Sequence, residues 1–599
     1  MEIKQKKRSE IPSEYKWNLC PLYPTDTDWY KAIETVKANI EALKKFEGTL
    51  HTGDAIFACL EKYYAACETE SRVYIYANLK RHENANVAEA QSMSDMAERI
   101  NTVFEEATAF ITPEILSHTA EDIYGFINTT PSLKMYAHHL NSLMRKKAHV
   151  LTTEMEALLA SAGEMAGTPE NAYQVLISTE LKFGNIVNEN GDTVEVTDGR
   201  RSALLDSHDR RVRKDTFDTF WGGYNKLKNT FATLFSASIK KDIFFAKARK
   251  YETTLDASLH ENNIPRAVYE NLISTVHEYL PVMYRYIALR KKILGLDALH
   301  MYDKSVPLTD EVEMKITYDE AKKMLIEGLA PLGEEYLNDM AHGMESGWID
   351  VYESEGKTNG AFEWAGLGTQ PYVLLNYEDN LDGLLGHLAH EMGHAMHDFY
   401  TNANQPHVYA DHTYFTAEVA ATVHETMMMN HLIKYTNDPK TRLYLIDKYI
   451  EQFRGTMFRQ VMFAEFEMIT HRMAEEGEPL VLETINKVYR QLNEKYHGPE
   501  MIIDKAADIE WAWIEHFYDA FYVYQYATSF AAAIAFTKHL QSGDPQKRAH
   551  YLNFLKAGSS DYPIELLKKA GVDMSTPAPI REALKVFESL VDELEKGFK

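Results

Sequence analysis

The chain has 599 residues, of which 45% are hydrophobic and 25% are charged. This composition is typical of folded proteins and excludes a disordered or fibrous chain, while the length exceeds what one hydrophobic core usually organises. The formal net charge of -26 argues against nucleic acid as a partner, because contact with phosphate requires clustered lysine and arginine.

The cysteines and the apolar runs bear on the cellular compartment. Cys20, Cys59 and Cys67 contain no CxxC pair and cannot all pair with one another, which favours reduced thiols. The longest small-apolar run, 530–536, is far shorter than the roughly 20 residues that a bilayer span requires. The basic N-terminal stretch is followed by no apolar segment of signal-peptide type. We therefore expect a cytoplasmic protein with no membrane partner.

Helical patterning dominates the first third of the chain. From residue 29 to about residue 178, apolar residues recur every three or four positions. The segment 183–197 differs, because two alternating runs flank Asn190 and Gly191, a pair that favours a two-residue hairpin turn. We expect a helical N-terminal domain over residues 1–190 and a second domain over residues 191–599.

The second domain is also predicted to be mainly helical. Helical spacing covers residues 200–299 and resumes at residue 381. Between them lie three short runs rich in Trp, Tyr and Val: GWIDVYES, GAFEWAG and PYVLLNY. The sequence therefore predicts a mainly α fold with one small β-sheet immediately before the helix at residue 381.

Residues 381–399, LDGLLGHLAHEMGHAMHDF, predict an amphipathic helix whose polar face could bind a metal ion. His390 and His394 are four residues apart, so their side chains lie one helical turn from each other and can share one ion. With Glu391 they form the pattern H-E-x-x-H, in which two histidines bind zinc and the glutamate takes a proton from the zinc-bound water.

A hydrolytic zinc site also needs a third protein ligand and an open position for water. Residues 416–430 predict a second helix, on which Glu418 and Glu425 are seven apart and project from nearly the same face. If the two helices pack side by side, Glu418 can reach the metal while Glu425 hydrogen-bonds a ligand histidine. Taken alone, the two glutamates are better interpreted as solvated surface carboxylates, but their position after the H-E-x-x-H helix reverses that interpretation. Because this ligand set is complete, we expect the flanking His387 and His397 to be polar residues of the cleft.

These residues resemble the thimet-oligopeptidase-like zinc metallopeptidases, and most of all their oligoendopeptidase F branch. The resemblance covers nearly the whole chain. It rests on EYKWNLCPLYP at 14–24, PYVLLNY at 371–377, HEMGHAMH at 390–397, AEVAATVHE at 417–425 and HFYDAFYVYQYATSF at 516–530.

The resemblance implies a large helical, two-lobed body with a deep central channel, and the small β-sheet next to the zinc helix. Short peptides would enter this channel and folded proteins would not. It also implies that the domain over 191–599 is the catalytic zinc-peptidase domain, in which His390, His394 and Glu418 hold Zn2+. The role of Glu391 as the base that activates the water carries over in the same way.

The resemblance further implies that His516 and tyrosines in the His/Tyr-rich segment 513–530 bind the substrate and its oxyanion. Hydroxyl or imidazole groups can stabilise the negative charge that develops on an attacked carbonyl. We assign this role to His516 with Tyr522 or Tyr526. The helical pattern places both tyrosines on one face with Tyr518, which also qualifies. Tyr524 is a further candidate. The alternative is that this aromatic stripe only packs in the core.

The sequence therefore predicts a zinc-dependent endopeptidase that hydrolyses internal bonds of short oligopeptides with a glutamate-activated, zinc-bound water. Two alternatives stay open. The chain could be a zinc dipeptidyl carboxypeptidase or carboxypeptidase of related fold, or a non-catalytic peptide-binding protein with a structural zinc.

Overall fold

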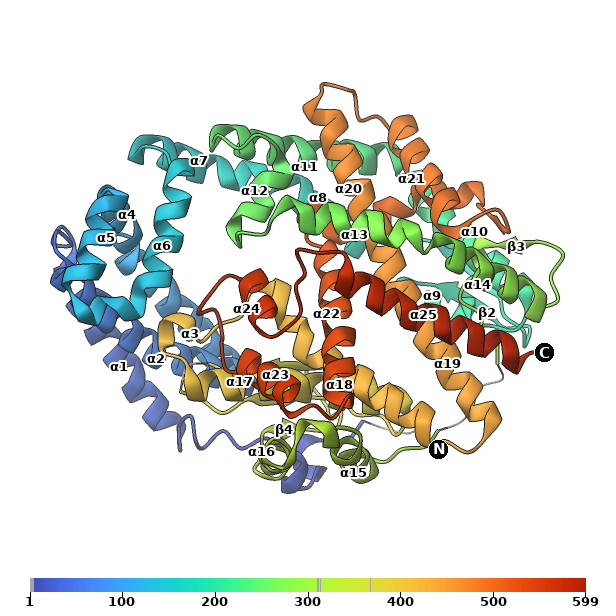
Figure 1. The fold of residues 1–599 in the computed structure, drawn as a ribbon, viewed down its shortest axis with the longest axis horizontal. Helices are drawn as coiled ribbons and strands as arrows, with labels where there is room; N and C mark the ends of the chain where they lie inside the picture. The colour runs from blue at the N-terminus through green and yellow to red at the C-terminus, as the bar shows by residue number, and fades with distance from the viewer. Residues whose placement is uncertain (1–4, 310–311, 313, 367) are drawn as a thin grey trace. The chain divides into compact units, whose positions relative to one another are not determined.

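Helices make up most of the computed structural model, which describes residues 5–309, 312, 314–366 and 368–599 (Figure 1). The short strands form three small sheets, so the mainly α fold that the sequence predicts is confirmed. The chain divides into two compact units. Unit 1 comprises Met1–Ala148, Glu313–Leu432 and Ala533–Val572, and unit 2 comprises His149–Val312, Ile433–Ala532 and Asp573–Lys599.

The α-helices of unit 1 come from three separate stretches of the sequence. They are α1 (Asp26–Leu43), α2 (Gly53–Glu83), α3 (Ala88–Thr108), α4 (Ile111–Ser117), α5 (Ala120–Thr129), α6 (Ala137–Lys146), α15 (Tyr318–Gly328), α16 (Glu334–Glu345), α17 (His390–Asn404), most of α18 (Tyr414–Tyr435), α23 (Pro545–Leu555) and α24 (Pro563–Lys569).

The α-helices of unit 2 are similarly drawn from separate parts of the chain. They are α7 (Thr153–Ala166), α8 (Thr168–Val175), α9 (Asp198–Leu205), α10 (Arg210–Lys226), α11 (Lys228–Ala248), α12 (Thr254–Glu261), α13 (Arg266–Glu278), α14 (Leu280–Ile293), α19 (Pro439–Phe453), α20 (Gln460–Glu475), α21 (Leu482–His497), the first half of α22 (Tyr524–Gln541) and α25 (Ala578–Gly597).

The N-terminal helices share one hydrophobic core with the sheet that precedes the metal motif. On α1, apolar residues at helical spacing, including Trp29 and Val36, are fully buried, and α1, α2 and α3 pack against one another (Figure 1). The same core contains Tyr372 and Leu374 of strand β6 (Tyr372–Leu374). Distant parts of the chain therefore form one unit. The expected domain division at residue 190 stays a prediction, since these units follow contacts and not chain order.

Three strands form the sheet that the sequence places before the metal motif. Strands β4 (Ile349–Asp350) and β6 are parallel, while β5 (Phe362–Trp364) is antiparallel to β6, in the order β4-β6-β5. Both β5 and β6 contact α17. The prediction of a small sheet next to the helix that carries His390 is confirmed, because each of the three Trp-, Tyr- and Val-rich runs contains one strand.

A hairpin forms where the alternating pattern predicts it, but its turn is longer than expected. Strands β1 (Gly184–Val187) and β2 (Thr193–Val196) pair antiparallel, so five residues connect them. Asn188 Oδ1 accepts hydrogen bonds from the backbone N–H groups of residues 190 and 192, and Gly191 takes a positive φ of 88°. The predicted two-residue turn is therefore wrong, because the Asn188 side chain stabilises a wider loop. A two-stranded parallel sheet, β3 (Leu299–His300) with β7 (Met501–Ile502), was not predicted.

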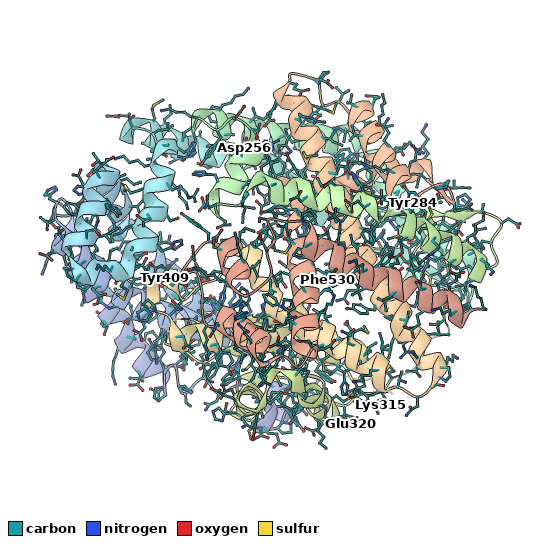
Figure 2. All side chains as sticks on the ribbon, viewed as in Figure 1. Asp256, Tyr284, Lys315, Glu320, Tyr409 and Phe530 are labelled. Atoms are coloured by element: carbon teal, nitrogen blue, oxygen red, sulfur yellow. The ribbon has the colours of Figure 1, made fainter. Side chains whose placement is uncertain are left out.

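Buried aromatic residues and a buried ion-pair cluster hold unit 2 together. Phe530 of α22, which Figure 2 labels, packs edge-on against Phe453 of α19 with ring centroids 4.8 Å apart. Asp303 is completely buried and accepts hydrogen bonds from Arg210 and Arg213 at 2.8 Å each. Across the described part of the chain, no helix combines the length and the apolar character needed to cross a membrane.

Candidate metal centre

The first turns of α17 carry the H-E-x-x-H residues. A π-helical segment, Gly383–Ala389, runs directly into α17, so the chain is helical from residue 381 to residue 404. The predicted helix 381–399 is therefore present, although its first part is π-helical. Asn380 begins it, because its Oδ1 accepts a hydrogen bond from the Gly383 N–H at 2.8 Å. Single π-turns of this kind are frequent at functional sites.

A glycine lets α17 and α18 approach each other closely. A Cβ atom on Gly393 would lie 2.4 Å from Ala421 Cα and 2.8 Å from the Ala420 carbonyl oxygen. The two backbones therefore touch at this point, which no larger residue would allow. On α18, Glu418 lies three residues before Ala421 and Glu425 four residues after it, so both carboxylates flank the crossing point on the face toward α17.

The crossing brings three predicted metal ligands together. The Nε2 atoms of His390 and His394 are 3.2 Å apart, and each lies 3.6 Å from Oε2 of Glu418. Tetrahedral ligand atoms that sit about 2.0–2.2 Å from a zinc ion are about 3.3–3.6 Å from one another. The three atoms therefore have the spacing of one face of a zinc tetrahedron. Among the described residues, this trio is the one group of His, Cys, Asp or Glu side chains that could hold an ion.

Glu425 orients the His390 imidazole through the ring nitrogen that faces away from the candidate metal position. Its Oε1 lies 2.5 Å from His390 Nδ1, so the imidazole donates its Nδ1 proton there and leaves Nε2 free to act as a ligand. Burial lowers the pKa of His390, but the hydrogen bond to Glu425 and the nearby carboxylates outweigh it and raise this pKa to about 9. The contact that the sequence predicts between Glu425 and one of the histidines is present.

His424 is a positioning residue that the sequence analysis missed. Its Nδ1 lies 3.1 Å from the carbonyl oxygen of Ala389, and its Nε2 lies 2.6 Å from the hydroxyl of Tyr336. Burial lowers the pKa of His424 to about 3, so the ring is neutral, donates to Ala389 and accepts from Tyr336. It therefore fixes the residue that precedes His390. The sequence feature that could have indicated this role is the position of His424 on the predicted helix, directly before Glu425.

Glu391 lies in an environment suited to proton transfer. Its side chain is only 6% exposed. Burial raises the pKa of this carboxyl group, and the neighbouring His390 and His394 oppose the rise. A carboxylate whose pKa is raised toward neutrality can both accept and return a proton during one reaction.

A second buried carboxyl group, that of Glu363, lies near Glu391 and was not predicted from the sequence. Glu363 of strand β5 has its pKa raised well above the usual value by burial, with Asp398 and Glu391 adding to the rise. Nothing in the strand pattern GAFEWAG distinguished this residue from a solvated one.

The expectation for His397 is wrong. This side chain is 2% exposed and stacks on His412 with ring centroids 3.7 Å apart, while Phe554 of α23 covers it at 5.3 Å. Burial lowers its pKa well below the usual value, so it is a neutral core residue and not a polar cleft residue. His387 differs, because it is half-buried in the π-helical segment.

In unit 2, three residues of the predicted His/Tyr-rich segment form one cluster. The ring centroids of His516 and Tyr522 are 5.7 Å apart, and those of His516 and Tyr526 are 5.9 Å apart. The Tyr526 hydroxyl lies 3.3 Å from His516 Nε2. All three side chains are half-buried, so they remain accessible to a ligand.

The helical face predicted for this segment is wrong. Helix α22 begins only at Tyr524, and Phe521 takes a positive φ of 62°. Tyr518 instead stacks on Tyr173 at 4.5 Å, and Tyr524 packs against Tyr269 at 5.0 Å. Of the four candidate tyrosines, the fold therefore places Tyr522 and Tyr526 beside His516 and places the other two in the core.

Comparisons with known proteins agree on one family. The model of "Peptidase family M3" matches residues 203–586, and that of "Oligopeptidase F" matches residues 114–183. Oligopeptidase PepF of Bacillus subtilis is 42% identical over 98% of this chain and 88% of its own length. Group B oligopeptidase PepB of Streptococcus agalactiae is 37% identical over 98% of both chains. The crystal structure of oligoendopeptidase-F from Enterococcus faecium has a TM-score of 0.73 and 34% identity, covering 96% of this chain and 99% of its own.

The close helix crossing predicts the effect of a single methyl group. In Gly393→Ala, the new Cβ would displace α17 from α18, so we expect the protein to lose about 1–3 kcal/mol of stability. Because the candidate ligands move apart, we also expect its affinity for zinc to fall by at least about tenfold. Gly125→Ala on α5 is the control, since a Cβ there meets nothing within 4 Å. Thermal unfolding and zinc content after dialysis against a zinc buffer measure both effects. Equal zinc content in the two variants would show that the crossing does not set the site.

Proposed function

This chain belongs to peptidase family M3, and on that premise we propose that it is a zinc-dependent endopeptidase that hydrolyses internal bonds of short oligopeptides. The observation that carries the proposal is the spacing of 3.2, 3.6 and 3.6 Å among the three candidate ligand atoms. The cytoplasm, which the cysteine pattern favours, is the compartment that we propose.

The ligand set favours a catalytic metal over a structural one. His390, His394 and Glu418 would hold zinc through two nitrogens and one oxygen, a set found in hydrolytic zinc enzymes, whereas structural zinc sites are closed by four protein ligands, often cysteines. A bound zinc ion would lower the pKa of water and polarise the scissile carbonyl. The donor set thus weighs against a peptide-binding protein with a structural zinc.

Proton transfer is the role that we propose for Glu391. Its carboxylate takes one proton from the attacking water as the water oxygen bonds to the carbonyl carbon. The same proton then passes from the carboxyl group to the amide nitrogen, so that the C–N bond breaks and a neutral amine leaves. The raised pKa of the buried carboxyl group suits both halves of this transfer.

Stabilisation of the oxyanion is the role that we propose for the cluster in unit 2. Negative charge develops on the carbonyl oxygen during attack, and hydrogen-bond donors stabilise it. Tyr522, Tyr526 and His516 offer two hydroxyl groups and one imidazole within a single cluster. His516 also borders a cavity of about 350 Å³ that Tyr224, Phe463 and other residues line.

Peptides with blocked ends test the reaction type. We expect mass spectrometry to show internal cuts in N-acetylated, C-amidated peptides of short length, and no cuts after a chelator removes the metal. Restoring zinc should restore cleavage. A carboxypeptidase would instead leave the amidated peptide intact and trim the free peptide from its C-terminus. Cleavage that survives the chelator would contradict the metal-dependent proposal.

Replacing Glu391 by Gln tests the proposed base. In Glu391→Gln the amide cannot accept the proton, so we expect kcat to fall by at least about 10²–10⁴ with zinc still bound at one equivalent. Glu345→Gln on the surface of α16 should behave like the wild type. Near-normal turnover of Glu391→Gln would exclude this residue as the base.

Three Tyr→Phe variants separate catalysis from packing. Tyr522→Phe and Tyr526→Phe each remove one hydroxyl group from the cluster, and loss of an oxyanion donor costs about 10²–10³ in kcat. We expect at least one of them to show such a loss with little change in KM. Tyr518→Phe is the matched control and should stay within about twofold, because this ring packs on Tyr173. Equal activity of all three variants would remove the tyrosines from the mechanism.

A further inference from the structure

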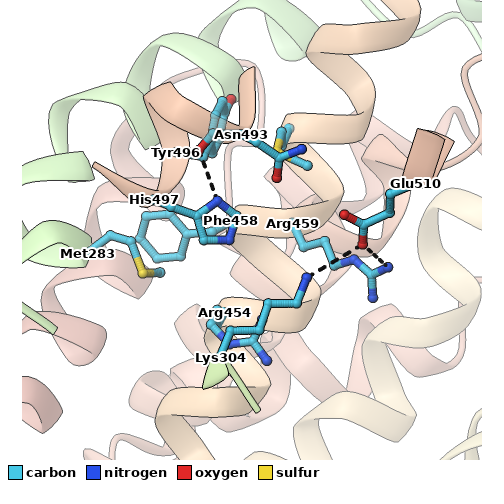
Figure 3. Close-up of a pocket in the computed structure, with 10 residues that line it drawn as sticks. Met283, Lys304, Arg454, Phe458, Arg459, Asn493, Tyr496, His497 and Glu510 are labelled. Carbon is cyan, nitrogen blue, oxygen red and sulfur yellow. Dashed lines mark hydrogen bonds and ion pairs between the residues drawn. The ribbon is translucent and has the colours of Figure 1, made fainter. Parts of the chain in front are cut away.

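A small cavity inside unit 2 is walled by an unusual number of cationic side chains (Figure 3). The volume in which the centre of a water-sized molecule can lie is about 20 Å³, so the cavity can hold a small molecule or ion. Three different helices, α14, α20 and α21, and the segments beside them contribute its walls. The charged residues that line it are Lys304, Arg454, Arg459 and Glu510.

One carboxylate oxygen of Glu510 forms ion pairs with two of these cations. Oε1 of Glu510 lies 3.5 Å from Lys304 Nζ and 3.3 Å from Arg459 Nη2, and Figure 3 shows both side chains converging on it. Because Glu510 carries one negative charge, this group of three side chains keeps a surplus of one positive charge. The side chains of Glu510 and Lys304 are 3% and 13% exposed, so bulk water screens them little, whereas Arg459 is 28% exposed and partly screened.

The third cation, Arg454, is paired with a carboxylate outside this group. Arg454 donates to Glu451 at 2.6 Å, but the other oxygen of Glu451 already accepts from Tyr286 at 2.6 Å and faces the fully buried Arg290 at 3.6 Å. Glu451 is therefore shared between two arginines. Asp447 supplies a second negative charge beside Arg290, so the positive surplus at the cavity resides on Lys304 and Arg459.

The titration behaviour of the lining residues reflects this surplus. Burial lowers the pKa of Lys304 to about 8, and Arg459 and Arg454 add to the effect while Glu510 opposes it. His497 cannot offset the charge, since burial and Lys304 lower its pKa to about 4 and its Nδ1 donates to the Asn493 carbonyl at 3.0 Å. A buried positive charge without a partner is costly, and a bound anion removes that cost.

We propose that this cavity binds one monovalent, halide-sized anion, which Lys304 and Arg459 hold by their N–H groups. The surplus of one positive charge matches a monovalent anion, whereas a divalent phosphate or sulfate would leave a net negative charge in the cavity. Met283, Phe458 and Met462 line the other walls. Apolar walls suit a weakly hydrated halide better than a strongly hydrated polyanion.

Bromide in crystals of the full chain tests the site directly. We expect one anomalous bromine peak inside the cavity, within hydrogen-bond distance of Lys304 Nζ and of the Arg459 guanidinium group. A water molecule without anomalous signal at this position, in crystals soaked at high bromide concentration, would overturn the proposal.

Thermal unfolding tests it in solution. At constant ionic strength, replacing sodium gluconate by sodium chloride should raise the Tm of the wild type in a saturable manner, because an anion that binds only the folded state stabilises it. Lys304→Met should weaken the apparent chloride affinity by at least about tenfold. Glu510→Gln should strengthen it, since the competing carboxylate is gone. Lys214→Met, which alters an exposed ion pair with Asp218 on α10, should keep the wild-type response.

If Lys304→Met weakens the apparent chloride affinity and Glu510→Gln strengthens it, a specific site is distinguished from a general effect of salt. An equal rise of Tm in both salts would overturn the proposal, as would an unchanged chloride response in Lys304→Met. If Lys304→Met does not fold, the wild-type comparison of the two salts and the bromide peak decide the matter without it.

Discussion

Backbone contact between α17 and α18 is the constraint on which the metal site depends. A Cβ atom at residue 393 would lie within 2.4 Å of Ala421, so these helices can be this close only with glycine at the crossing. The crossing lies one residue before His394 and three residues after Glu418. Metal ligands need placement to within a few tenths of an ångström, and a direct backbone contact fixes it more rigidly than flexible side chains could.

A second layer of hydrogen bonds stabilises what the crossing positions. Glu425 holds the ring of His390, and His424 holds the carbonyl oxygen of Ala389 at the start of α17. Both come from the α18 side, so one helix supplies a proposed ligand, Glu418, and both supporting residues. Strands β5 and β6 contact α17, and β6 shares its hydrophobic core with the N-terminal helices. The described residues of the N-terminal part, 5–148, thus support the site without contributing a candidate ligand to it.

Local spacing could predict part of this arrangement, and contacts between distant residues decide the rest. The two candidate ligand histidines and the helix 381–399 follow from helical spacing alone. The turn at Phe521 does not, because its N–H donates to buried Glu467 at 2.9 Å, a residue 54 positions earlier. His397 has the same helical spacing as a cleft residue, but the ring of His412 stacks on it and Phe554 of α23 packs against it. Patterns in one segment cannot show such partners.

X-ray absorption at the zinc edge tests the central claim most directly, since it measures the ligands of the ion itself. For the zinc-loaded protein we predict four light ligands at about 2.0–2.1 Å, two of them imidazole nitrogens. In Glu418→Gln we predict either a lost oxygen ligand or a fall in zinc content. A six-coordinate site, or a spectrum that replacement of His394 leaves unchanged, would contradict the proposal that these residues bind the metal.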